Sequence, residues 1–176
     1  MKRLSETAAL EKLRKLKDGF RDHIRNEYEQ KAEPCATCST PGACCIDAHF
    51  VNVRISRLEA VTIRRTLDDL PTDRRVEIDQ RINDAIKTFR LDGDGNFRKT
   101  FACPLYDREA GCLVHDSGKP LPCIHHACYE RKEDLPPDEI LDEAEITVER
   151  LNRRVYGRQL PLLPLPVAIR NASRSV

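Results

Sequence analysis

The residues best able to do chemistry in this chain are its eight cysteines, which fall into two groups of four. The first group is compact and ends in an adjacent pair: Cys35, Cys38, Cys44 and Cys45. The second group is widely and irregularly spaced: Cys103, Cys112, Cys123 and Cys128. Four thiolates complete one tetrahedral zinc site or hold one iron–sulfur cluster, so eight suffice for two sites. The sequence therefore predicts that these cysteines bind metal.

The spacing of the cysteines limits how they can share a site. A Cys-x-x-Cys turn brings both sulfurs to the same side, so Cys35 and Cys38 can approach one ion. In extended backbone, neighbouring side chains point to opposite sides. We therefore expect Cys44 and Cys45 to serve different metals, or different irons of a cluster. The second group must be assembled by tertiary structure, and we expect ligands of the two groups to be interleaved.

The redox compartment decides between metal ligands and disulfides. An even number of cysteines in a secreted chain would indicate a disulfide framework. Residues 1–7 contain no apolar run of signal-peptide length, and no stretch approaches the roughly 20 apolar residues of a membrane span. We therefore expect a cytoplasmic protein with reduced thiols that makes no membrane contact.

Composition predicts a single small domain without a nucleic-acid partner. The chain has 176 residues, of which 34% are charged and 5% aromatic, so its apolar core must be thin. The net charge is +1 with both signs interspersed, whereas nucleic-acid binding normally needs a clustered basic face. The short basic pairs Arg64-Arg65, Arg74-Arg75 and Arg153-Arg154 are expected on helix surfaces.

Hydrophobic periodicity predicts a mainly α fold with irregular metal-stapled loops and at most one short strand, at residues 49–55. Amphipathic helices are expected at residues 4–32, 56–70, 71–90 and 136–157. Ser56 and Glu59 form a capping box for the second of these helices. Apolar residues spaced by three and four in the last helix form a narrow seam, which we expect to pair with the first helix.

Three segments of the chain are expected to have different roles. Residues 1–33 form an N-terminal amphipathic helix, residues 34–131 a metal-binding core, and residues 132–176 a helix and an apolar, proline-rich tail. Residues 97–131 contain few large apolar side chains, so a bound metal would supply stability that they lack. The tail at residues 160–167 is not expected to be helical, and it either packs on its own domain or docks a partner.

The combined cysteine pattern resembles a known family. The matching residues are Cys35-x-x-Cys38-x5-Cys44-Cys45, Cys103-Pro104, Gly111-Cys112-Leu113-Val114-His115, Lys119-Pro120-x-x-Cys123 and Cys128. This pattern, over about residues 34–130, is similar to the YkgJ-type cysteine-cluster family. Members of that family are described as zinc- or iron-chelating domains or as iron–sulfur oxidoreductases, and flagellin lysine-N-methylases carry a related cluster. The resemblance implies that all eight cysteines are candidate ligands, and it leaves the metal open.

The chain departs from the family pattern at two places. Lys119 stands where the family often has arginine, so a basic residue is kept but a bidentate hydrogen bond is lost. His125 and His126 occupy positions where the family more often shows arginine and an aromatic-proline pair. These two histidines, together with His115, either bind metal, tune a cluster or are polar surface. His23 and His49 are expected to be structural.

Three functions are compatible with this pattern. Thiolate sites carry net negative charge, which these basic residues could offset: Arg98, Lys99, Arg108, Lys119 and the histidines. Clusters tolerate irregular cysteine spacing, which slightly favours an iron–sulfur protein with a redox or cluster-dependent enzymatic role. The alternative is a zinc-stapled interaction module, and a lysine-N-methylase is weaker because no glycine-rich loop follows a strand. The expected partners are metal ions and a protein or redox partner.

Overall fold

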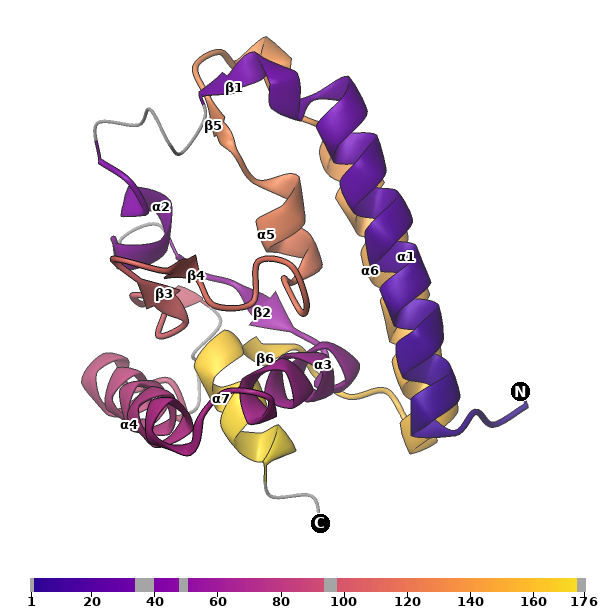
Figure 1. The fold of residues 1–176 in the computed structure, drawn as a ribbon. Coiled ribbons are helices and arrows are strands. Elements are labelled where there is room, and N and C mark those ends of the chain that lie inside the picture. Colours follow the sequence, from indigo (N-terminus) through magenta and orange to yellow (C-terminus); the bar gives the residue numbers. More distant parts are fainter. Residues whose placement is uncertain (1, 34–39, 48–50, 94–97, 174–176) are drawn as a thin grey trace. The chain divides into compact units, whose positions relative to one another are not determined.

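The computed structural model describes residues 2–33, 40–47, 51–93 and 98–173. It confirms the predicted mainly α fold, with strands of two residues each in the described part of the chain (Figure 1). The chain divides into two units, and each is built from two separate stretches. The first unit comprises Met1–Pro41 and Pro120–Leu160, and the second comprises Gly42–Lys119 and Pro161–Val176.

Two long helices form the first unit, and they lie side by side as predicted (Figure 1). They are α1 (Glu6–Glu27) and α6 (Asp138–Tyr156). Ser5 begins α1 as its N-cap, because its hydroxyl accepts a hydrogen bond from the N–H of Ala8. Gly157 ends α6 in a left-handed conformation that glycine adopts without strain. The facing stripes bury these side chains: Ala9, Leu13, Phe20, Ile24, Ala144, Val148 and Leu151.

Short elements complete the first unit. A 3-10 turn, η1 (Glu29–Lys31), leads into β1 (Ala32–Glu33), which pairs antiparallel with β5 (Cys128–Tyr129). The helix α5 (Leu121–His125) packs against α1 and α6, and η3 (Lys132–Asp134) leads toward α6.

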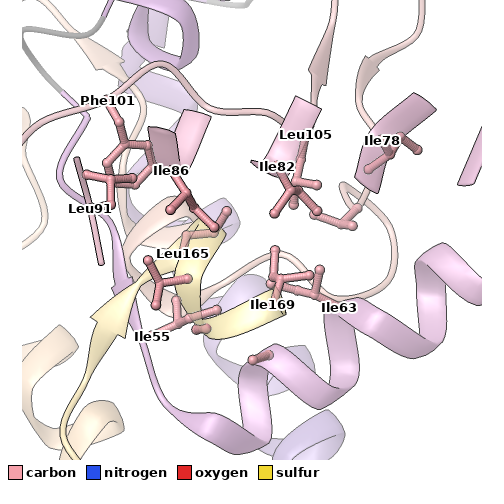
Figure 2. Close-up of a cluster of buried hydrophobic side chains, with 14 of the residues drawn as sticks. Ile55, Ile63, Ile78, Ile82, Ile86, Leu91, Phe101, Leu105, Leu165 and Ile169 are labelled. Carbon is pink, nitrogen blue, oxygen red and sulfur yellow. The ribbon is translucent and has the colours of Figure 1, made fainter. Parts of the chain in front are cut away.

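The second unit is organised around three helices, α3 (Arg57–Asp68), α4 (Thr72–Phe89) and α7 (Leu165–Ala172). The predicted capping box begins α3, with both reciprocal Ser56–Glu59 hydrogen bonds present. Figure 2 shows how side chains from all three helices meet those of the loops in one hydrophobic core. The fully buried members include Ile55, Ile63, Ile78, Leu91, Phe101 and Ile169.

The prediction that the apolar tail at residues 160–167 is not helical was wrong for residues 165–167, which begin a helix. Leu163–Pro164 forms β6, which pairs with β2 (Arg54–Ile55), and α7 begins directly after it. Pro166 lies in the first turn of α7, where the missing N–H has no helical partner to lose. Leu165, Val167, Ala168 and Ile169 are all buried. The tail therefore packs in the core of its own unit. A strand was predicted at residues 49–55, and within the described residues 51–55 only Arg54–Ile55 forms one, β2. His49 lies outside the described residues.

Arg64 was expected on a solvent-exposed helix surface, but its side chain is nearly buried. Its side chain is only 10% exposed, and its guanidinium group contacts Asp79 at 2.5 Å and Asp68 at 3.0 Å. Arg64 lies on the buried side of α3 because these two carboxylates compensate its charge.

Among the described residues, none of the helices has the length and apolarity to cross a membrane.

Candidate metal centre

The two units each contain some of the predicted ligands. Cys44, Cys45, Cys103 and Cys112 belong to the second unit, whereas Cys123 and Cys128 belong to the first. All six are partly buried thiols that form no disulfide. Cys35 and Cys38 lie outside the described residues.

Cys103 opens a turn whose backbone points hydrogen-bond donors at its sulfur. Backbone hydrogen bonds from Leu105 and Tyr106 act on this thiol, and the N–H of Tyr106 also donates to the Cys103 carbonyl at 3.4 Å. Burial raises the pKa of Cys103 to about 11, and the nearby Cys112 thiol adds to that effect. The two backbone donors and the Arg81 guanidinium act in the opposite direction, because they favour the thiolate. Burial outweighs these contacts, so the Cys103 thiol holds its proton more tightly than a free thiol does.

Cys112 repeats this arrangement at the end of a hairpin formed by β3 (Tyr106–Asp107) and β4 (Gly111–Cys112). The N–H of Val114 donates to its sulfur, and the N–H of His115 donates to its carbonyl at 3.0 Å. Burial raises the pKa of Cys112, and Lys119 opposes that shift. The charge of Lys119 thus acts in the direction that would favour a thiolate at Cys112. Cys103 and Cys112 both pack against the hydrophobic core of the second unit.

The adjacent cysteines do not lie in extended backbone, so the premise for separating them was wrong. They form the middle of α2 (Ala43–Ile46), a four-residue helix. Successive residues of a helix are rotated by about 100°, whereas those of a strand point to opposite sides. The structure therefore removes the geometric reason for assigning Cys44 and Cys45 to different sites.

Backbone contacts hold α2 against the hairpin. The N–H of Cys103 donates to the carbonyl of Cys45 at 2.7 Å. The ring of Tyr106 lies directly on Gly42, which precedes α2 with a φ of +78°. A side chain at position 42 would be strained by that φ and would overlap the ring. Tyr106 is also the strand partner of Cys112, so one residue connects α2 with both cysteine turns.

Charged side chains of α4 fix the same hairpin to that helix. These contacts were not predicted from the sequence. Asp107 accepts hydrogen bonds from the N–H groups of Glu109 and Ala110 and from Arg74 at 3.0 Å. These contacts hold the pKa of Asp107 well below its usual range, with the backbone hydrogen bond from Ala110 as the largest cause. Arg81 donates to the carbonyl of Tyr106.

Two features of the sequence could have indicated these contacts between α4 and the hairpin. Arg74 and Arg81 are seven residues apart, so they share one face of a helix. An aspartate that begins a tight turn is a common anchor for such side chains.

The first unit places its predicted residues differently. Cys123 lies in α5, and Cys128 lies opposite Glu33 in the β1–β5 pair. His125 stacks on Phe20 with ring centroids 6.4 Å apart, and its Nε2 is 3.3 Å from the carbonyl of Pro137. A carbonyl only accepts, so Nε2 carries the proton of this hydrogen bond. The ring of His125 is thus oriented by its own unit.

The remaining histidines of the described chain face solvent. His115 and His126 are exposed, and His23 is exposed with its ring edge-on to Tyr28 at 5.8 Å.

A basic hollow of about 400 Å³ opens in the first unit, lined by Arg3, Arg153, Arg154 and Gly157. Arg154 donates from Nε to the carbonyl of Lys2 at 3.0 Å, and its own carbonyl accepts from the N–H of Leu4 at 3.1 Å. These contacts fasten the N-terminal residues to the end of α6. Arg153 is exposed, as expected of this basic pair.

The described side chains do not form a closed ligand set. Within residues 2–33, 40–47, 51–93 and 98–173, no three His, Cys, Asp or Glu side chains are grouped so as to hold a metal ion. A ligand set drawn from the described residues alone would therefore require some of the thiols to reorient.

Comparisons with protein-family models, curated proteins and solved structures each found no match. The resemblance to the YkgJ-type family accordingly rests on the cysteine pattern alone.

Proposed function

We propose that this chain is a cytoplasmic metal-binding protein that uses an iron–sulfur cluster in a redox or cluster-dependent enzymatic role. Its candidate ligands are Cys35, Cys38, Cys44, Cys45, Cys103, Cys112, Cys123 and Cys128. The proposal is carried by the turns at Cys103 and Cys112, whose sulfurs accept hydrogen bonds from backbone N–H groups. Hydrogen bonds of this kind stabilise metal-bound thiolates and adjust the reduction potential of a cluster.

A zinc-stapled structural or interaction module is the second candidate. The observation that favours it is the packing of Cys103 and Cys112 against the hydrophobic core of the second unit. An ion bound there would tie the hairpin to the core, as structural zinc does in small domains. The lysine-N-methylase alternative is supported only by the family resemblance.

Metal analysis of protein purified in parallel with and without oxygen tests the proposal and separates the two candidates. We expect a coloured protein that contains iron and sulfide and loses its absorption in air. A colourless protein with bound zinc would replace the first candidate with the second. A folded protein that contains neither metal, with eight titratable thiols, would contradict metal binding altogether.

Matched variants identify the ligands. Cys103→Ser and Cys112→Ser should each lower the metal content, because serine nearly preserves size but is a poor ligand for a soft site. His115→Gln and His126→Gln provide exposed control substitutions, and metal loss in either would add a histidine to the ligand set.

A further inference from the structure

We propose that the basic hollow at the end of α6 binds the phosphoryl group of a small molecule. The hollow has a volume of about 400 Å³ and is lined by Arg3, Arg153, Arg154 and Gly157. That volume lies at the lower end of the roughly 300–1,000 Å³ found for small-molecule sites. All four residues belong to the first unit. The inference goes beyond the proposed metal binding and does not depend on it.

Hydrogen bonds on both sides of Arg3 hold this residue at the end of α6. The carbonyl of Lys2 accepts from Arg154 Nε at 3.0 Å, and the N–H of Leu4 donates to the Arg154 carbonyl at 3.1 Å. The Arg3 guanidinium reaches Gly157, because its Nη2 would lie 3.6 Å from a Cβ built at that glycine. The two stretches of chain that line the hollow are therefore fixed to each other, although Lys2 and Arg154 are 152 residues apart.

The arginines of the hollow are not neutralised by carboxylates. Other arginines of the chain are paired, since Arg64 and Arg74 each contact a carboxylate oxygen within 3.0 Å. By contrast, Arg3, Arg153 and Arg154 form no ion pair with any residue that the structure describes. Three guanidinium groups thus surround one hollow without compensation, an arrangement that a bound anion would relieve.

The acidic residues nearest in the chain leave this charge in place. The carboxylate of Glu6 accepts a hydrogen bond from the Tyr156 hydroxyl at 2.8 Å. Glu149 lies one helical turn before Arg153, a spacing that favours an ion pair, yet the two do not pair in the described structure. Residues 2–6 and 153–158 contain five basic residues and one acidic residue. The hollow therefore carries net positive charge.

The side chains, rather than the helix ends, must supply the attraction. Here α1 begins beside the end of α6, so the partial positive charge of one helix lies next to the partial negative charge of the other. These two contributions oppose each other. The anion would accordingly be held by the guanidinium groups.

A phosphoryl group matches these donors better than a carboxylate does. Each guanidinium presents a planar fork of donors that can bind two oxygens of one phosphate. A phosphoryl group offers three oxygens and a charge of about −1.5 to −2 near pH 7, whereas a carboxylate offers two oxygens and a single charge. The Nε of Arg154 is used by the Lys2 carbonyl, which leaves its two Nη groups for a ligand.

Titration of the full chain with inorganic pyrophosphate, and with acetate at equal ionic strength, tests the proposal. Isothermal calorimetry measures the dissociation constant, and amide chemical shifts locate the site. We expect pyrophosphate to bind with a stoichiometry of one and to shift the amide signals of Leu4 and Gly157. Acetate should bind at least about tenfold more weakly, because it makes fewer charge-assisted hydrogen bonds.

Matched variants test the lining of the hollow. Arg3→Gln and Arg153→Gln should each weaken pyrophosphate binding by about tenfold or more. Arg25→Gln is the control, because Arg25 is an exposed arginine in the last turn of α1 and does not line the hollow. It should leave the dissociation constant within about twofold of wild type. Arg154 is left unchanged because it holds residues 2–4, and circular dichroism checks that each variant folds.

The contrary outcomes are distinct. A folded wild-type protein that does not bind pyrophosphate would overturn the proposal. An equal loss of affinity in Arg25→Gln and Arg153→Gln would also overturn it, because net charge rather than the hollow would then attract the anion. Binding of a short RNA or of phosphatidic acid vesicles without binding of pyrophosphate would assign the surface to a polymer or a membrane instead. None of these results bears on the metal content, so the proposed function is tested separately.

Discussion

The N–H of Cys103 donates to the carbonyl oxygen of Cys45 at 2.7 Å, although 58 residues (103 − 45) separate them in the chain. This hydrogen bond joins the two cysteine groups that the sequence presents as separate. It places a four-residue helix against a turn whose sulfur already accepts two backbone hydrogen bonds. The neighbourhood of Cys103 is therefore where metal binding should have its largest structural effect.

Amide hydrogen exchange should reveal that effect. The N–H groups of Leu105, Tyr106 and Val114 donate to cysteine sulfurs, and these bonds strengthen when the sulfur is a metal-bound thiolate. We expect a chelator to speed exchange at these three amides while those of Ile82 and Ile86, inside α4, change little. Residue-resolved exchange with and without chelator is the measurement. Unchanged protection at all five amides would show that no metal stabilises the turns.

Gly42→Ala should destabilise the second unit, because the new methyl group would meet the Tyr106 ring at a backbone conformation that alanine adopts only with strain. Gly19→Ala is the matched control. Gly19 lies inside α1 with open space around it, and alanine there should stabilise the helix by up to about 1 kcal/mol. Denaturant unfolding of both variants measures the two effects. If Gly42→Ala were as stable as wild type, the close contact between α2 and the hairpin would be wrong.

High pH should destabilise the metal-free protein through Cys103. Folding raises the pKa of this thiol from 9.0 to about 11, so the folded state holds the proton more tightly than the unfolded state. The resulting stabilisation is present below pH 9 and is lost as the pH rises toward 11, by at most about 2–3 kcal/mol. Unfolding of metal-free wild type and Cys103→Ala across this range measures the loss. An equally steep decline in both proteins would assign it to other groups.

The helices that the sequence predicted well are those specified by local signals. The stripes of α1, α3, α4 and α6, with the capping residues Ser5, Ser56 and Gly157, depend on neighbours a few residues away. The tail was mispredicted because its prolines count against a helix in general. Pro166 is harmless only in the first turn, and α7 is stabilised by burial against α3 and α4.

The candidate site likewise combines features that the local sequence specifies with features that depend on residues far apart in the chain. Cysteine identity and spacing sufficed to name the candidate ligands, and the sequence also named Lys119 as a candidate compensating charge. The association of α2 with the hairpin depends on the Tyr106–Cys112 pairing and on a glycine with positive φ, which no local pattern specifies. Arg81 was missed because its partner, the carbonyl of Tyr106, is 25 residues away.

The misprediction of the tail leads to a direct test of its structural role. Ile169 in α7 is fully buried in the core of the second unit (Figure 2), so Ile169→Ala should cost about 2–5 kcal/mol by creating a cavity. Val76 in α4 is 65% exposed, and Val76→Ala should change stability by no more than about 0.5 kcal/mol. The measurement is urea unfolding of both variants. Their midpoints report stability when the slope of the unfolding free energy against urea concentration is the same for both. Equal stability of the two variants would mean that residues 165–172 do not belong to the core and that the tail is available to a partner.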